Sequence, residues 1–348
     1  MKKIKKKYIS LDKFINKALY NKKNGYYMTK NPLGEKGDFI TAPKISILFS
    51  EIIAIWCIAF WESLGCPKKI NIIEMGAGDG EMMYQMIKVF QRFKRFTKTS
   101  KFLIFEKSDF LKKIQKKKMS SFEVSWINSL DNVKNGPNIF LANEFFDSLP
   151  IKQFIKKKNI WFEKKIKLSI NKNYELVDKI TNLNILEKKI GINLRKNQNF
   201  IEFSPFAYKY LKIISKKINR FDGGLLIIDY GYIEKTMKNS LQSVYKHKFS
   251  NFLKNIGKSD ITYNISFHLI KRILKKLNLK VAGIISQKNF LIKLGIMQRA
   301  EILAKNLKFS EKANIYFRIN RLIDNKFMGN LFKVMFVTKK NNKFKIGF

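Results

Sequence analysis

Short apolar runs alternate along this chain with longer stretches that mix apolar and charged residues. Runs of strand length occupy residues 70–75, 102–105, 124–127, 139–142 and 225–229. Two later runs, at 281–286 and 331–338, extend the series to seven. Strands that alternate with helices assemble into a mostly parallel sheet with helices packed on its faces. The pattern therefore predicts an α/β fold built on a seven-stranded, Rossmann-like sheet.

The same pattern divides the chain into four parts. Residues 1–69 include an apolar stretch, 45–61, which is shorter than a membrane span and carries polar residues. We interpret it as a buried amphipathic helix in an N-terminal helical cap that also forms the active-site mouth. Residues 70–150 and 222–348 would supply the two halves of the cofactor-binding domain. Between them, residues 151–221 mix short apolar runs with lysine and asparagine, which predicts an inserted lobe.

The chain is strongly basic, with a formal net charge of +44. Clustered cations attract nucleic acid, but all except eight of the 70 cationic residues are lysines, and they are spread along the whole chain. Arginine is the side chain that contacts phosphates and guanines in a bidentate way. We therefore do not expect nucleic acid to be the main partner, although the positive field should attract acidic ones.

The cysteines and histidines predict no metal site, and the N-terminal sequence predicts no export signal. Cys57 and Cys66 belong to no CxxC or Cys/His cluster, and His247 and His268 stand alone. No uninterrupted apolar run follows the basic N-terminus, so we predict no signal peptide and no membrane span. We expect a cytoplasmic protein if the chain is bacterial, and a mitochondrial matrix protein only if it is eukaryotic.

The clearest chemical signal is INIIEMGAGDGEMM, a strand that leads through a glycine-rich turn into a helix. The turn contains Gly76, Ala77, Gly78 and Gly80. Its glycines would let the backbone turn tightly and approach a ligand closely. A dinucleotide-binding loop would end in glycine where this chain has Glu81, and Glu74 and Asp79 add further negative charge. Such a turn suits a cationic cofactor without phosphate, such as S-adenosylmethionine; the alternative is an ordinary strand-to-helix turn.

Polar side chains also follow the next predicted strands. Glu106 ends the run at 102–105, where a carboxylate can accept both ribose hydroxyls of a nucleoside. The run at 139–142 leads into Asn143, Glu144 and Asp147. Because ligands bind at the carboxyl edge of an open α/β sheet, these side chains are candidates for the site. Glu106 could instead be a solvated charge, and Asp147 a helix cap.

Asp229 is the last residue of the run at 225–229 and Tyr230 follows it, so both would lie at the same edge, unless they only form a turn.

Two classes of nucleic-acid methyltransferase have characteristic motifs that this sequence lacks. An Asn or Asp followed by two prolines and an aromatic residue is absent after the fourth strand. A Pro-Cys nucleophile is absent as well, since both cysteines precede the glycine-rich turn.

Several blocks of the chain resemble the MidA-type methyltransferases, a family that includes a mitochondrial complex I assembly factor acting on an arginine of a complex I subunit. The matching blocks are ALYNKKNGYYMTKNPLGEKGDFITAP, the glycine-rich turn, ANEFFDSLPIKQF, IIDYGY, residues 246–267, FLIKLGI and RLIDNKFMGNLFKV. The resemblance implies a class I methyltransferase fold that binds S-adenosyl-L-methionine. The residues implied to hold the cofactor are Glu74, Gly76, Ala77, Gly78, Gly80, Glu106 and Asn143. Those implied to close the mouth are Gly37, Asp38, Thr41 and Pro43.

The chain departs from the family pattern at four positions, with Ala77 for Pro, Asp79 for Arg, Lys44 for Glu and Ser266 for Asp. The changes at Lys44 and Ser266 affect the inferred substrate more than the inferred cofactor.

The expected reaction is direct attack of an arginine guanidinium on the sulfonium methyl group. Arginine is protonated at physiological pH, so carboxylates from Asp38, Glu144 or Asp147 would orient the guanidinium and localise its charge on one nitrogen. The acceptor would be an arginine-containing protein such as a complex I subunit, and the chain could act as a homodimer. Two alternatives stay open: a cofactor-binding assembly factor with little catalytic role, and a methyltransferase for RNA or a small molecule.

Overall fold

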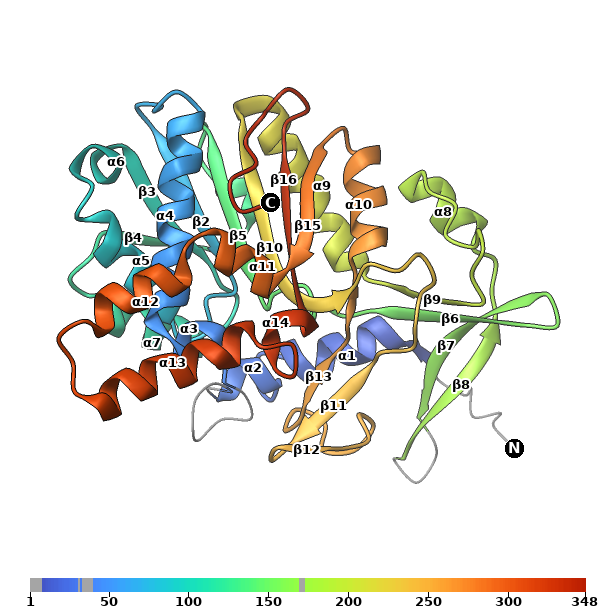
Figure 1. The fold of residues 1–348 in the computed structure, drawn as a ribbon. Coiled ribbons are helices and arrows are strands. Elements are labelled where there is room, and N and C mark those ends of the chain that lie inside the picture. Colours follow the sequence, from blue (N-terminus) through green and yellow to red (C-terminus); the bar gives the residue numbers. More distant parts are fainter. Residues whose placement is uncertain (1–7, 31, 33–39, 169–172) are drawn as a thin grey trace, which may run out of the picture.

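The centre of the protein is a mostly parallel sheet with helices on both faces (Figure 1). This computed structural model describes residues 8–30, 32, 40–168 and 173–348. Seven strands follow the order β15-β16-β10-β5-β2-β3-β4, and only β16 is antiparallel to its neighbours. They are β2 (Ile70–Met75), β3 (Ser100–Phe105), β4 (Val124–Ile127), β5 (Asn138–Asn143), β10 (Gly223–Tyr232), β15 (Lys280–Ser286) and β16 (Phe332–Thr338). The predicted α/β fold is confirmed, and a short strand, β14 (Ile265–Ser266), also pairs with β10.

Two hydrophobic cores lie on the two faces of this sheet because its central strands are apolar on both sides. On β2, Ile72 belongs to one core and Ile73 to the other, as the alternation of strand side chains requires. The first face is covered by α4 (Ile47–Ser63), α5 (Glu81–Phe90), α6 (Lys94–Thr99), α11 (Gln287–Lys293), α12 (Ile296–Ala304), α13 (Phe309–Ile323) and α14 (Met328–Leu331). The second is covered by α1 (Leu11–Tyr20), α9 (Pro205–Phe221), α10 (Phe267–Lys276) and the 3-10 turn η1 (Leu130–Asn132).

Helix α4 accounts for the most apolar stretch of the sequence. It buries side chains around most of its circumference because α3 (Ala42–Ile45), α5 and α12 pack against it in addition to the sheet. The expectation of an amphipathic helix is therefore wrong in this respect, since its few exposed positions include Ile47 and Ile55. Within the described ranges, no helix combines the length and apolarity needed to cross a membrane.

A second, antiparallel sheet stands beside the central one. Its path is β1-β7-β6-β9, and β8 pairs with the free side of β7. The strands are β1 (Tyr8–Ser10), β6 (Lys152–Lys157), β7 (Ile160–Leu168), β8 (Tyr174–Ile180) and β9 (Phe200–Phe203), with α8 (Asn184–Ile190) before β9. Lys158 and Asn159 turn β6 into β7 with positive φ at both positions, as a tight two-residue hairpin requires. Helix α9, which ends this stretch of chain, packs on β5 and β10 of the central sheet.

The carboxyl edge of the central sheet is covered by segments from the N-terminal region and from residues 242–262 (Figure 1). Helices α1, α2 (Tyr26–Thr29) and α3 come from the N-terminal region. Helices α1 and α2 contact a small sheet of β11 (Gln242–Tyr245), β12 (Lys248–Phe249) and β13 (Asp260–Thr262), in the order β12-β11-β13. Helix α7 (Asp109–Lys118), which joins β3 to β4, contacts α2. The sheet edge where ligands bind is thereby enclosed.

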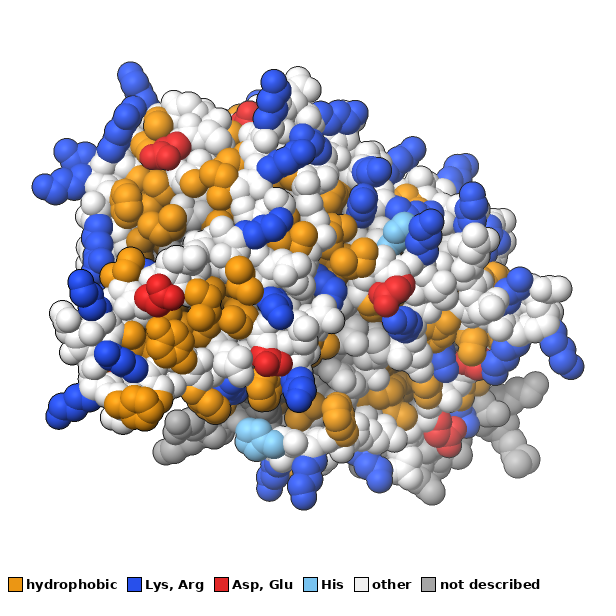
Figure 2. Space-filling view, in the orientation of Figure 1, with side chains coloured by type: hydrophobic (Ala, Val, Ile, Leu, Met, Phe, Trp, Pro, Cys, Tyr) orange, Lys and Arg blue, Asp and Glu red, His pale blue; other side chains and the backbone are white. Residues whose placement is uncertain are grey.

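Lysine and arginine side chains are scattered over the face seen in Figure 2 and are not gathered into one patch. Acidic side chains are few on that face and lie singly between them. This scatter on the surface is what the even spread of lysine along the sequence predicts.

Candidate functional site

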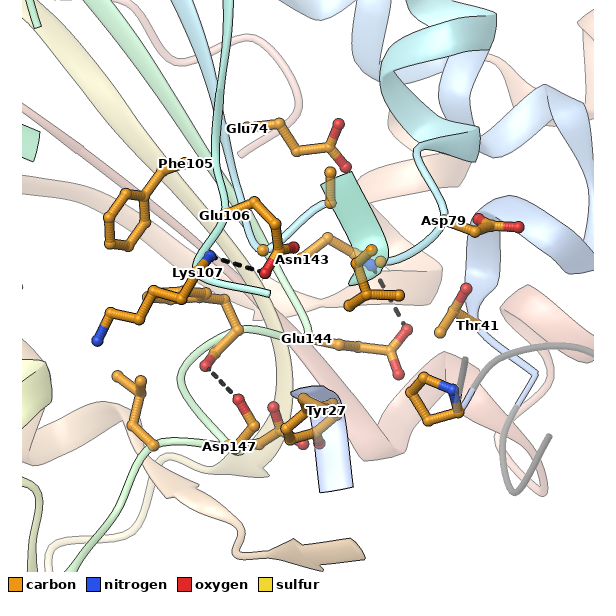
Figure 3. Close-up of a pocket in the computed structure, with 18 of the residues that line it drawn as sticks. Tyr27, Thr41, Glu74, Asp79, Phe105, Glu106, Lys107, Asn143, Glu144 and Asp147 are labelled. Carbon is orange, nitrogen blue, oxygen red and sulfur yellow. Dashed lines mark hydrogen bonds between the residues drawn. The ribbon is translucent and has the colours of Figure 1, made fainter. Parts of the chain in front are cut away.

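A cavity that is partly open to solvent lies at the carboxyl edge of the sheet (Figure 3). The order of the strands reverses between β2 and β5, and open α/β sheets bind their ligands at such a switch point. The walls are the loops after β2, β3 and β5, together with residues of α1, α2, α3, α9 and β13. All segments predicted to carry the chemistry meet here, except one that lies outside the described residues.

The glycine-rich loop forms the wall nearest β2. Gly76, Ala77 and Gly78 line the cavity, whereas Gly80 does not and instead caps α5 in a left-handed conformation, with φ of 83°. A Cβ atom on Gly76 would stand 2.8 Å from Cδ2 of Phe145, and φ at Gly76 is 67°. The loop is therefore packed so tightly that glycine is needed for both its conformation and its contacts.

The acidic residues of this loop do not present free negative charge. Asp79 pairs with Lys44 at 2.8 Å and with Lys118 at 3.2 Å, and Lys118 also pairs with Glu81 at 2.6 Å. Burial alone would raise the pKa of Asp79, but the hydrogen bonds and charges of the two lysines lower it below its ordinary value. Asp79 and Glu81, two of the three carboxylates near this turn, therefore already have cationic partners, contrary to the prediction of free negative charge.

Glu74 is the third of these carboxyl groups, and it is buried at the end of β2. Burial raises its pKa to about 8, so it is mostly neutral at pH 7. Its atom Oε2 has no hydrogen-bond partner in the described structure. A buried polar atom without a partner is costly, and a ligand that supplies one would be favoured.

Glu106 lies at the end of β3 and lines the same cavity. Its Oε1 accepts hydrogen bonds from the backbone amides of Lys107 and Ser108, both at 2.8 Å, and Oε2 accepts one from Gln115 at 3.2 Å. Burial raises the pKa of Glu106 above its ordinary value, against these bonds, which lower it. Gln115 also donates to the carbonyl oxygen of Gly78 at 2.8 Å. One glutamine of α7 thus fixes the two loops relative to each other, a role that sequence reasoning missed.

The loop after β5 supplies the opposite wall. Asn143, Glu144 and Asp147 all line the cavity. Glu144 has φ of 49°, an unusual conformation for a residue with a side chain, and its amide donates to the Ile228 carbonyl at 2.9 Å. The carboxyl group of Glu144 accepts a hydrogen bond from the side-chain amide of Asn143 at 3.4 Å, and the neighbouring backbone of Ala42 lowers its pKa. The strained backbone directs this side chain into the space between the sheet edge and the cap (Figure 3).

The two acids of this loop have different proton affinities. Burial, together with the charge of Asp147, raises the pKa of Glu144 to about 8. Burial raises the pKa of Asp147 to about 6, against a hydrogen bond from Tyr230 that lowers it. Near pH 7, Glu144 is mostly protonated and Asp147 mostly ionised. Asp147 Oδ1 and Asn143 Oδ1 are further buried atoms without a hydrogen-bond partner in the described structure.

Asp229 does not line the cavity but lies beneath this loop, fully buried. Its Oδ2 accepts from the amides of Phe146, at 3.0 Å, and Asp147, at 3.3 Å. Its Oδ1 accepts from the amide of Tyr230 at 3.0 Å, and Tyr230 itself lines the cavity. Of the pair Asp229 and Tyr230, only the tyrosine reaches the cavity, and the aspartate holds the backbone around it.

Two lining residues that sequence reasoning did not assign join the cap to the small sheet. Tyr27 of α2 donates a hydrogen bond to Oδ1 of Asp260, the first residue of β13, at 2.7 Å. Both lie in blocks that resemble the MidA-type family, and this was the signal that could have drawn attention to them. Of the predicted mouth residues, Thr41 and Pro43 line the cavity. Gly37 and the candidate catalytic residue Asp38 lie outside the described residues.

Comparisons with known proteins agree with this architecture. A family model for S-adenosyl-L-methionine-dependent methyltransferases matches residues 52–285. The chain is 29% identical to the mitochondrial protein arginine methyltransferase NDUFAF7 of Xenopus laevis, over 93% of this chain and 80% of that protein. The human protein of that name is 28% identical, over 93% and 78%.

Among solved structures, a superfamily member from Burkholderia thailandensis with bound S-adenosyl-homocysteine has a TM-score of 0.83 and 18% identity, and the match covers 98% of this chain and 90% of that one. A second crystal structure of a Burkholderia thailandensis protein has a TM-score of 0.79 over 98% and 89%, also at 18% identity. At this identity the likeness concerns the fold, which these proteins share along nearly the whole chain.

Proposed function

Because this chain belongs to the family of S-adenosyl-L-methionine-dependent methyltransferases, we propose that it transfers a methyl group to an arginine side chain of a protein. The observation that carries the proposal is the acidic wall opposite the glycine loop. Asp147 offers a buried oxygen without a partner, and Glu144 lies on the same loop. A guanidinium group is planar, cationic and rich in N–H donors, so it matches such a wall.

The residues of the cavity fit the cofactor at its other end. Glu106 can accept ribose hydroxyls through Oε2, and the unpartnered Oε2 of Glu74 suits an N–H donor such as the ammonium group of the cofactor. Gly76, Ala77 and Gly78 carry small side chains or none, so the cofactor can approach the backbone of this loop closely. When bound, the cofactor supplies a methyl group on a positively charged sulfur.

Asp147 and Glu144, the two acids of the loop after β5, would have different roles toward the methyl acceptor. Asp147, the more acidic of the two, would pair with the guanidinium and fix its plane. Glu144, whose pKa is about 8, would accept the proton that the acceptor nitrogen loses in its ionised form, which is the minor form near pH 7 and the major form above about pH 8. Asp38, which lies outside the described residues, stays a predicted third carboxylate for this purpose.

The curated relatives support arginine as the acceptor, since they are named protein arginine methyltransferases and cover most of this chain. The finer predictions from the sequence are unchanged: a complex I subunit as acceptor, action in the cytoplasm, a homodimer, and the four-part division at residues 69, 150 and 221. The relatives are named as mitochondrial proteins, so the compartment depends on the source of the chain.

The test is to incubate the purified protein with methyl-labelled cofactor and a cell lysate, and to identify the labelled residue by mass spectrometry of hydrolysed protein. We expect methylarginine in wild type and its loss in Asp147→Ala, with cofactor affinity kept within about threefold. Glu202→Gln, which alters a buried carboxyl group outside the cavity, is the matched control and should retain label. Label in RNA or small molecules alone would refute the arginine assignment, and retained turnover in Asp147→Ala would remove Asp147 from the mechanism.

A further inference from the structure

One segment of the cap touches both ends of the cavity. Residues 41–46, which we call the strap, contain the single helical turn α3. Thr41 and Pro43 line the cavity between the glycine loop and the loop after β5. From this segment Lys44 pairs with Asp79 of the glycine loop at 2.8 Å, and the backbone of Ala42 lies beside the carboxyl group of Glu144, whose pKa it lowers.

We infer that Lys44 is a positioning residue: through its ion pair with Asp79 it holds the strap so that Thr41, Pro43 and the backbone of Ala42 between them stay beside Glu144 at the cavity wall. The cofactor loop and the acid of the acceptor wall are thereby coupled through three residues of one helical turn. The importance of this coupling for catalysis rests on the proposed role of Glu144, whereas the coupling itself does not.

The strap is rigid enough to transmit this contact. The amides of Lys44 and Ile45 both donate to the Thr41 carbonyl, at 3.0 and 3.1 Å, and the Ser46 amide donates to Ala42 at 3.2 Å. Ala42 and Ile45 are buried, and Arg318 of α13 donates to the Ile45 carbonyl at 3.3 Å. A shift of Lys44 away from Asp79 must therefore move the turn as a unit, and Ala42 with it.

The ion pair between Lys44 and Asp79 is sufficiently buried to contribute measurably to holding the strap in place. The side chains of Lys44 and Asp79 are only 23% and 11% exposed, so the pair is less screened than one on the open surface. Lys118 of α7 pairs with the same oxygen of Asp79, at 3.2 Å, and its other ion-pair partner, Glu81, lies outside the strap. Replacing Lys118 is therefore a matched control, because it removes a positive charge beside Asp79 without removing a residue of the strap.

The carboxyl group of Glu144 is the reporter of this coupling. It faces Asn143 and Asp147 of its own loop, Asp229 of β10, Asp260 of β13 and the Ala42 amide of the strap. Among these neighbours the Ala42 amide lowers the pKa of Glu144, and the nearby aspartates raise it. Losing the strap contact should therefore raise the pKa.

The experiment uses the full chain and needs no methyl acceptor. Hydrogen exchange of residues 41–46 and carbon NMR of labelled glutamate are recorded for wild type, K44M, D79N, the double variant and K118M, with and without S-adenosyl-homocysteine. K44M and D79N should each speed exchange of the strap by about 2- to 5-fold, and the double variant should be no faster than either. K118M should leave strap exchange at the wild-type rate.

The direction in which the pKa of Glu144 changes distinguishes an effect of strap position from a simple effect of charge. K44M removes a positive charge and D79N a negative one, so charge alone would shift the pKa of Glu144 in opposite directions. The inference requires both variants to raise it. Opposite shifts, unchanged strap exchange in K44M, or equal effects of K118M and K44M would overturn it. None of these outcomes depends on which molecule is methylated, so the proposed function is tested separately.

Discussion

Asp229 is predicted to support the acceptor wall from below, and its replacement tests how much that support contributes. Its carboxylate accepts three buried backbone amides, those of Phe146, Asp147 and Tyr230, at 3.0, 3.3 and 3.0 Å. Asparagine can keep its oxygen toward the first two, but its NH₂ group would then face the amide of Tyr230. One buried N–H loses its acceptor, so D229N should reduce the free energy of unfolding by about 1–3 kcal/mol.

Alanine at this position removes the acceptor for all three amides. D229A should therefore reduce the free energy of unfolding by about 3–5 kcal/mol, or prevent folding at moderate temperature. Urea denaturation followed by circular dichroism measures both changes. For folded D229N we also expect methyl transfer to fall more than cofactor affinity, because the displaced loop carries Glu144 and Asp147.

Asp222 provides the control for these variants. It also accepts a backbone amide, that of Gly223 at 2.7 Å, but it is not fully buried and has φ of 70°. Asparagine has nearly the same shape as aspartate and can keep its oxygen toward this amide, so D222N should change stability by less than about 0.5 kcal/mol. If D229N destabilises the protein no more than D222N, the carboxylate of Asp229 does not hold the loop.

Three further variants probe the cavity. Gly78→Val should abolish cofactor binding, because Gly78 has φ of 55° and lines the cavity; unchanged affinity by calorimetry would contradict this. Tyr27→Phe should reduce methyl transfer about 10-fold while leaving the fold intact, since only the 2.7 Å bond to Asp260 is lost; full activity would exclude a role for that bond. Glu144 binds more protons folded than unfolded, so its contribution to stability falls as pH rises from about 4.5 to about 8. Glu144→Gln should make the measured decline shallower, and an unchanged slope would argue against the raised pKa.

The sequence was sufficient for the fold where local chemistry decides the structure. The apolar run at Ile70–Met75 becomes β2 with the same bounds, and Gly76 and Gly78 have positive φ angles in the tight turn that was predicted after it. Glu106 and Asp147 reach the cavity because the ends of parallel strands converge at one edge. These features follow from periodicity and backbone geometry.

Other features depend on residues far apart in the chain, and no local pattern contains them. Tyr27 and Asp260 are separated by 233 positions, yet they share a hydrogen bond across the cavity. Asp79 was interpreted as free negative charge, but Lys44 comes from a segment that precedes the glycine loop and neutralises it. Glu74 was expected to be ionised, whereas burial makes it mostly neutral at pH 7. Charge state depends on tertiary surroundings, which the sequence does not display.

These corrections change how the site would accept a positively charged cofactor. The loop acids are already paired, so the attraction must come from groups that ionise when the cofactor arrives. Glu74, whose pKa is about 8 and whose Oε2 has no hydrogen-bond partner in the described structure, is the group best suited to do so. A nearby cation stabilises a carboxylate and lowers its pKa, so binding should release a proton.

Proton release makes affinity depend on pH in a fixed direction. Because the complex would hold fewer protons than the free protein, affinity for S-adenosylmethionine should increase as pH rises from about 6 to about 8, and level off above the pKa of the free carboxyl group. Calorimetry in two buffers with different ionisation enthalpies counts the protons released. Glu74→Gln should bind more weakly and release none, whereas Glu202→Gln, outside the cavity, should behave as wild type. Affinity that is independent of pH in wild type would mean that Glu74 stays neutral, and that the cofactor is held by its nucleoside and backbone contacts alone.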